Sequence, residues 1–66
     1  MISYEPLFRT MKEKSISSYK LQKEGISKGT YSNILNKKGI STHTINKLCT
    51  ILDCKVEDII EFTPDE

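Results

Sequence analysis

The chain has 66 residues, a length that allows one small domain with one hydrophobic core. Hydrophobic residues make up 36% of the sequence and charged residues 29%, a composition that argues against a disordered chain. No stretch has the pattern of a signal peptide or the roughly 20 apolar residues of a membrane span, so we expect a cytoplasmic protein with no membrane partner.

The charges are divided unevenly along the chain, although the net charge is only +1. Residues 1–47 hold nine Lys or Arg against three Asp or Glu, whereas residues 48–66 hold one Lys against six acids. Such asymmetry is typical of a protein whose basic part meets a polyanion, and it is equally compatible with a solvated basic face. On charge alone, both interpretations stay open.

Apolar spacing predicts five short helices and no strand, so the expected fold class is all-α. The first helix is expected over residues 4–14, with Ser3 as N-cap and Pro6 inside the first turn, where its missing N–H does no harm. Its inward-facing residues are expected to be Leu7, Phe8 and Met11.

Two short helices joined by a glycine turn are expected next. Ser17 is the predicted N-cap of the second helix, Leu21 its buried residue, and Gly25 the residue that turns the chain with a positive φ. The third helix is expected to begin after its N-cap, Ser27, and to be closed by "NKKG" at Gly39. Its inward stripe is expected to be Tyr31, Ile34 and Leu35.

The fourth and fifth helices are expected in the last third of the chain. Ser41 opens the fourth, which carries the strongest periodic signal of the sequence. Its apolar positions are Ile45, Leu48, Cys49 and Leu52. The fifth is expected in "KVEDIIEF", with the carboxylates of Glu57 and Asp58 near the positive end of the helix dipole. Its inward residues are Val56, Ile59 and Ile60.

The cysteine spacing gives no sign of a metal or redox site. Cys49 and Cys54 stand five positions apart, which fits neither a zinc ligand pair nor a CxxC motif. We expect both to be reduced apolar residues, and we expect no metal and no cofactor.

The order of these elements is similar to the Cro and phage-repressor (XRE) type of helix-turn-helix regulator. The shared pattern is a Ser-rich start and a Leu in helix two, then Gly, an aliphatic residue and Ser before helix three, and a closing apolar helix. The "MISYEPL" start and the "LCTILDCKVEDIIE" end are similar to very short bacterial members. The resemblance implies a compact five-helix, lambda-repressor-like domain over residues 1–66, with the helix-turn-helix at about 17–37 and an acidic tail at about 61–66.

The stretch "GISKGTYSNILNKKG" contains no acid, which suits a helix that enters the major groove between two walls of phosphate. The polar positions that fit base or phosphate contacts are Lys28, Thr30, Ser32, Asn33, Asn36 and Lys37. Asn33 is the best candidate for base readout because its amide matches the donor and acceptor of adenine. Lys28 is suited either to guanine or to phosphate, and both alternatives stay open.

Phosphate contacts are expected on both sides of the third helix. Ser27 is either a plain cap or turns its hydroxyl toward phosphate. The resemblance implies further contacts at the start of helix two and in the loop into helix four, at Ser17, Ser18, Lys37, Lys38, Ser41, Thr42, His43 and Thr44.

The resemblance thus implies sequence-specific binding to double-stranded DNA by a small transcriptional regulator, a repressor by preference. The sequence contains no grouping typical of an enzyme, and no small-molecule ligand is evident. The alternative is an antitoxin-like or anti-repressor interaction module whose acidic segment docks on a basic partner; steep salt dependence of duplex binding separates the two. We also expect weak homodimerisation through helix five and the tail, by Ile59, Ile60 and Phe62.

Overall fold

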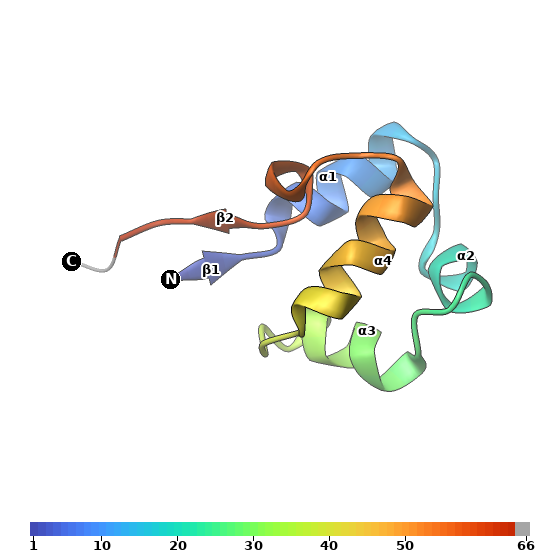
Figure 1. Ribbon diagram of the computed structural model, residues 1–66, viewed down its shortest axis with the longest axis horizontal. Helices are drawn as coiled ribbons and strands as arrows, with labels where there is room; N and C mark the ends of the chain where they lie inside the picture. The colour runs from blue at the N-terminus through green and yellow to red at the C-terminus, as the bar shows by residue number, and fades with distance from the viewer. Residues whose placement is uncertain (65–66) are drawn as a thin grey trace.

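The computed structural model describes residues 1–64, which form a mostly helical domain with a small two-stranded sheet. Along the chain the elements are β1 (Ile2–Ser3), α1 (Glu5–Glu13), α2 (Ser18–Lys23), α3 (Lys28–Leu35), α4 (Thr42–Leu52), the 3₁₀ turn η1 (Val56–Asp58) and β2 (Glu61–Phe62) (Figure 1). Of the acidic tail expected at residues 61–66, the last two residues lie outside this range. No helix within residues 1–64 is long and apolar enough to cross a membrane.

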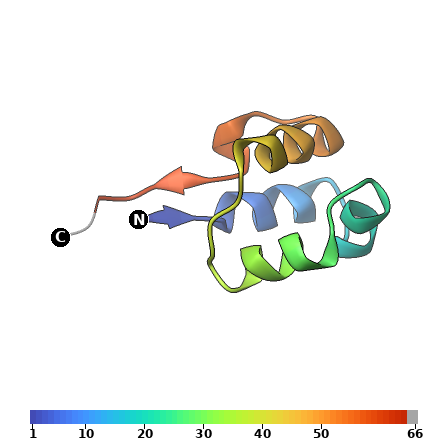
Figure 2. The ribbon, with the colours of Figure 1, turned by 60° about the horizontal axis from the view of Figure 1, so that its bottom comes forward.

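The helices are arranged in layers around α1. Figure 2 shows α4 and η1 on one side of α1, and α2 and α3 on the other. The strands β1 and β2 pair antiparallel, with Ile2 opposite Phe62 and Ser3 opposite Glu61. This ribbon extends away from the helices and brings the two ends of the described chain together.

The core takes one or two side chains from each helix. Its fully buried aliphatic residues are Leu7, Leu21, Ile26, Ile34, Leu48, Leu52 and Ile59. Every buried side-chain nitrogen or oxygen among the described residues has a hydrogen-bond partner. A core this small supplies only about 3 to 5 kcal/mol, so the ends of the short helices must contribute as well.

Three of the four helices begin as the sequence predicts. The hydroxyls of Ser17, Ser27 and Ser41 accept hydrogen bonds from the backbone N–H groups three residues later, at 3.3, 3.1 and 3.1 Å. The prediction for α1 is wrong by one residue, because its N-cap is Tyr4 and no side chain caps it. Ser3 instead accepts from the Glu5 N–H at 3.2 Å. The Tyr4 side chain is buried in the core, and this fixes where the chain enters α1.

Each of the four helices is followed, within two residues, by a residue with positive φ. These residues are Ser15 (56°), Gly25 (120°), Lys37 (60°) and Asp53 (50°). The expectation for Gly25 is therefore confirmed, whereas the expectation that Gly39 closes α3 is wrong. Lys37 takes the left-handed conformation instead, two residues earlier, because α3 already ends at Leu35.

The residue after each left-handed position donates its N–H to the carbonyl five residues earlier, as in a Schellman motif. The four bonds are Ile16 to Met11 (2.9 Å), Ile26 to Leu21 (3.0 Å), Lys38 to Asn33 (2.7 Å) and Cys54 to Cys49 (3.1 Å). In three of these pairs both residues belong to the core or pack against it. At the end of α3 both residues of the pair, Asn33 and Lys38, are polar and exposed.

The fifth helix is reduced to one 3₁₀ turn, and the expected absence of strands is wrong. A continuing helix would use the carbonyls of Asp58 and Ile59, but α1 takes both of them. The Thr10 hydroxyl donates to the Asp58 carbonyl at 2.8 Å, and the Leu7 N–H donates to the Ile59 carbonyl at 3.2 Å. The chain beyond this point therefore extends and pairs with β1.

Three apolar residues lie elsewhere than predicted. Leu35, Phe8 and Val56 were expected to face inward, and all three are exposed. Ile34 and Leu7 already fill the core beside Leu35 and Phe8, and Val56 lies at the start of the single turn to which the fifth helix is reduced. Ile59 was expected both to face inward and to contribute to a dimer interface; its side chain is fully buried in its own domain, which confirms the first expectation and contradicts the second. Ile59 could contact a second chain only if the core unfolded.

Cys49 and Cys54 are free thiols, as predicted, and their proximity has a structural cause. They are the two residues joined by the backbone bond that ends α4. Burial, together with the neighbouring Cys49 and Asp58, raises the pKa of the Cys54 thiol from 9.0 to about 11. Among the described residues no group of three or more His, Cys, Asp or Glu side chains is placed to hold a metal ion.

We expect the protein to fold without metal or disulfide, because its core and helix ends use neither. Circular dichroism during heating, with EDTA and a reductant present, should show a cooperative loss of helix. A chain already lacking helix under these conditions at low temperature would contradict this prediction.

The raised pKa of Cys54 predicts a loss of stability at alkaline pH. The neutral thiol stabilises the folded state fully below the unfolded pKa of 9.0, and this contribution is lost as the pH rises toward the folded pKa of about 11. Urea unfolding between about pH 8 and pH 11 should show a smaller decline for Cys54→Ala than for the wild type. Equal declines in the two proteins would show that Cys54 does not contribute.

Candidate functional site

The candidate site is built on α2, α3 and the turn between them. Gly25 makes the turn with a φ of 120°, and Ile26 next to it is buried in the core. From α4, the Lys47 ammonium donates to the Gly25 carbonyl at 3.3 Å. The angle between α2 and α3 is therefore fixed by a buried aliphatic residue and by a bond from a third helix.

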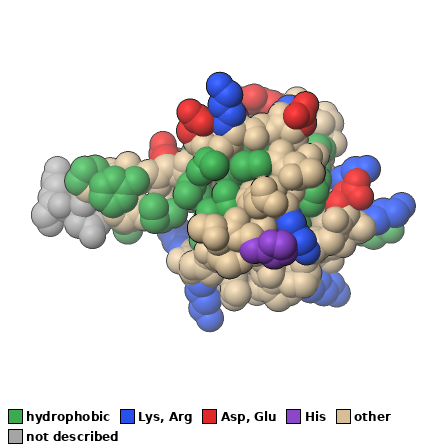
Figure 3. All heavy atoms as spheres, in the orientation of Figure 1, with side chains coloured by type: hydrophobic (Ala, Val, Ile, Leu, Met, Phe, Trp, Pro, Cys, Tyr) green, Lys and Arg blue, Asp and Glu red, His purple; other side chains and the backbone are tan. Residues whose placement is uncertain are grey.

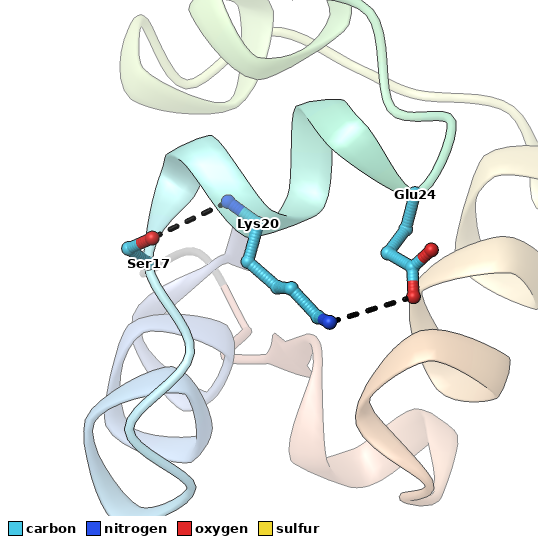
Figure 4. A network of polar contacts seen from close by, with 3 residues as sticks. All are labelled: Ser17, Lys20 and Glu24. Carbon is cyan, nitrogen blue, oxygen red and sulfur yellow. Dashed lines mark hydrogen bonds and ion pairs between the residues drawn. The ribbon is translucent and has the colours of Figure 1, made fainter.

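At the start of α2, Ser17 is exposed and Ser18 is half-buried. The Ser17 hydroxyl accepts from the Lys20 N–H, while the Lys20 ammonium reaches Glu24 at 3.7 Å (Figure 4). Figure 4 shows the Lys20 side chain directed along the helix toward its C-terminal end. The cation thus partly neutralises Glu24, the acid at the end of α2 that precedes the turn.

At the start of α3, one hydroxyl makes two bonds. Ser27 Oγ accepts from the Thr30 N–H at 3.1 Å and donates to Thr30 Oγ1 at 2.9 Å. Two roles were considered for Ser27, a plain cap and a phosphate contact, and both bonds support the plain cap. Thr30 is half-buried, whereas the neighbouring Lys28 is exposed at the first position of the helix.

Three polar residues follow on the outer side of α3, and they differ in how much of their hydrogen-bonding capacity is used. The Asn36 amide donates to the Ser32 carbonyl at 2.8 Å and to the Ser32 hydroxyl at 3.3 Å. Asn33 is exposed, and its amide has no hydrogen-bond partner within residues 1–64. Of these three residues, Asn33 is therefore the one whose side chain makes no hydrogen bond within residues 1–64.

A hydrogen bond from Tyr4, the N-cap of α1, holds the segment that follows α3. The Tyr4 hydroxyl donates to the Lys38 carbonyl at 2.5 Å, and the Tyr4 ring is buried beneath it. The side chains of Lys37 and Lys38 both point to solvent. This contact positions two cations at the C-terminal end of α3.

The start of α4 lies next along the chain. Thr42 and His43 are exposed, and Thr44 is half-buried. Thr44 Oγ1 and the Ser41 hydroxyl lie 3.1 Å apart in a hydrogen bond, so this cap repeats the Ser27 arrangement. The first turn of α4 thus offers backbone N–H groups and two exposed polar side chains.

The charged residues of α3 and of the segment that follows it are Lys28, Lys37 and Lys38, all of one sign. Neither α2, α3 nor α4 has an acidic residue in its first turn. On the face shown in Figure 3, the charged side chains at the lower edge, where α3 lies, are Lys or Arg, whereas most of the acids lie along the upper edge and one lies among basic side chains at the right. A surface of amides, hydroxyls and ammonium groups without acids can bind a polyanion and hydrogen-bond to base edges.

Sequence reasoning missed two residues that position this surface. Tyr4 and Lys47 each bind a backbone carbonyl far away in the sequence, at Lys38 and Gly25. Every residue has a backbone carbonyl, so the type of residue at Lys38 or Gly25 does not reveal that it accepts such a bond. The sequence shows only that Lys47 is basic and that Tyr4 has an apolar ring.

The comparisons with known proteins agree with this geometry. A family model for the Cro/C1-type helix-turn-helix DNA-binding domain matches residues 7–65. A crystal structure of the transcriptional regulator VanUg is similar to the chain, with a TM-score of 0.87 and 26% sequence identity. The similarity covers 97% of this chain and 87% of that one. No curated protein shows a significant match.

Proposed function

The chain belongs to the Cro/C1-type helix-turn-helix family, and we propose that it binds double-stranded DNA sequence-specifically through α3 as a small transcriptional repressor. The observation that carries the proposal is the outer side of α3, which is free of acids and presents an unengaged amide at Asn33. A regulatory role is supported by VanUg, which is a transcriptional regulator. A cytoplasmic location and the lack of an enzymatic role are part of the same proposal.

In this proposal Asn33 reads a base and the surrounding cations hold the phosphates. An exposed amide in the middle of a recognition helix matches the donor and acceptor of adenine in the major groove. Lys28 lies at one end of α3, and Lys37 and Lys38 lie at the other. Phosphates on both walls of the groove are then within the span of a single helix.

Further contacts are proposed for side chains beside α3. Ser18 at the start of α2 and Thr42 and His43 at the start of α4 are suited to the phosphate backbone, assisted by the N–H groups of the two helix starts. Ser17 and Ser27 act as caps in this proposal. Ser32 and Asn36 bond to each other, so they support the helix more than they read bases.

We expect Asn33 and Lys38 to differ in the kind of binding they provide. Asn33→Ala should weaken binding to the preferred duplex by about 1 to 3 kcal/mol and flatten the preference at one base pair. Lys38→Ala should weaken binding to all duplexes alike and lower the salt slope by about one. Selection from a random duplex pool, followed by salt titration, measures both effects.

The wild type and Ser32→Ala serve as controls in this experiment. Ser32→Ala should change the selected sequence less than Asn33→Ala does, because the Ser32 hydroxyl is engaged with Asn36. An unchanged motif with Asn33→Ala would refute base readout by this residue. A wild type that retains no duplex at low salt would favour the interaction module, either antitoxin-like or anti-repressor, over DNA binding.

Lys37 is expected to lower the free energy of unfolding and, through its charge, to strengthen DNA binding. Its φ of 60° is costly for any residue with a Cβ, so Lys37→Gly should raise the free energy of unfolding by about 0.5 to 1 kcal/mol. The same change removes a cation and should weaken binding to all duplexes. Ser15→Gly, at the end of α1, is the matched control: it should stabilise similarly, as measured by urea unfolding, and leave DNA binding unchanged.

A further inference from the structure

Gly29 is the second residue of α3, and no contact inside the domain requires a glycine there. It does not have a positive φ. Apart from its own turn of helix, no atom of residues 1–64 lies within 4 Å of the place where a Cβ would stand. A glycine inside a helix destabilises it relative to alanine, because the unfolded backbone is freer. The missing side chain therefore has a cost that nothing within the domain offsets.

The other two glycines of the chain differ from Gly29 in this respect. Gly25 has a φ of 120° and makes the turn between α2 and α3, so its backbone conformation accounts for it. Gly39 also has open space around it, but it lies in the loop after α3, where it weakens no helix. Among the three glycines, Gly29 alone lies in a helix.

Gly29 begins the exposed polar stripe of α3. Residues spaced by three, four and seven positions share one face of a helix. The four residues of this stripe, all exposed, are Gly29, Ser32, Asn33 and Asn36. None of them has a side chain longer than that of Asn, so the stripe is low, and it is lowest at Gly29. Gly29 lies one turn before Asn33, about 6 Å along the helix axis.

The first turn of α3 keeps its helical shape in spite of the glycine. The Ser27 hydroxyl binds both the N–H and the hydroxyl of Thr30, and the Tyr31 N–H donates to the Ser27 carbonyl at 3.0 Å. In Figure 2 α3 lies on the outside of the group of helices. A firmly held piece of bare backbone is therefore open to a partner at Gly29.

We propose that a thymine base contacts α3 at Gly29, with its 5-methyl group in the space that a Cβ would occupy. This proposal rests on the proposed function, because it places Gly29 beside the base that Asn33 reads. Gly29 has no side-chain donor or acceptor, so the surface it offers on this stripe is apolar. Of the base edges in the major groove, only that of thymine carries a methyl group.

A phosphate at the start of α3 would not account for the glycine. The N–H groups of a first helical turn point along the helix axis, and they bind an anion from that direction. A Cβ at Gly29 would project from the side of the helix, on the face shared with Asn33. The missing atom therefore makes room beside the stripe, where base edges lie, and not at the end of the helix.

The test uses the duplex that the wild type selects from a random pool, and versions in which each thymine in turn is replaced by deoxyuridine, which lacks the methyl group. At one thymine the replacement should weaken wild-type binding about three- to fourfold, through the loss of one buried methyl. That thymine should lie within about two base pairs of the pair whose preference Asn33→Ala flattens, given the spacing of one helical turn.

Gly29→Ala should reverse the effect of the methyl group. On the unmodified duplex it should weaken binding about tenfold or more, because two methyl groups would compete for one space. On the duplex with deoxyuridine at the sensitive position, its affinity should return to within about threefold of the wild type on the unmodified duplex, since the alanine methyl takes the place of the thymine methyl.

Two controls separate this effect from a change in the fold. Urea unfolding of Gly29→Ala should have a midpoint at or above that of the wild type, because alanine favours the helix. A loss of binding together with a gain in stability has no explanation in the folded domain alone. Gly39→Ala makes the same chemical change in the loop, and its ratio of affinities for the two duplexes should equal that of the wild type.

Equal binding of the unmodified duplex by Gly29→Ala and the wild type would overturn the proposal and leave the proposed function standing. So would a uniform loss on all duplexes that deoxyuridine does not restore, since a phosphate would then be the group that approaches Gly29. A selected sequence with no thymine near the pair read by Asn33 would also overturn it. A wild type that binds no duplex at low salt would count against the proposed function, and this proposal would fall with it.

Discussion

The hydrogen bond from a backbone N–H to the carbonyl five residues earlier, just past a left-handed residue, is the contact on which this small fold depends. Helices of six to eleven residues are marginal by themselves, and each must be stopped where the chain can turn toward the core. The four bonds do this for α1 to α4. In three cases the two joined residues are also apolar neighbours, so one device ends the helix and adds to the core.

At the end of α3 the backbone hydrogen bond is present, but the apolar contact between the two joined residues is absent. Asn33 and Lys38 occupy the positions that Leu21 and Ile26 occupy at the end of α2, where both are buried. The exposed polar pair removes a contribution to the core, and the Tyr4 hydrogen bond to the Lys38 carbonyl compensates by attaching the helix end to α1. A departure from a local pattern of this kind is expected where a surface serves a partner instead of the core.

Features with a local signal were predictable from the sequence, and features that depend on distant contacts were not. The Ser caps at residues 17, 27 and 41 and the turn at Gly25 each follow from a few neighbouring residues. The short η1 depends on α1 taking the carbonyl of Ile59, and the ribbon pairs opposite ends of the chain. Lys37 in the left-handed region carries no local signal either, because helices usually use Gly there. At the site, the exposed polar face of α3 was predictable, whereas the supports from Tyr4 and Lys47 were not.

The segment after α3 illustrates how little surface a chain of this size can set aside for a single purpose. Lys37 takes the left-handed conformation just after the helix, and the carbonyl of Lys38 accepts the bond from Tyr4. Their ammonium groups also continue the basic surface of α3. Because Tyr4 is buried and its hydroxyl donates to the Lys38 carbonyl, this segment is held against the start of α1. The position of the two cations relative to the core is therefore fixed by a contact from outside α3.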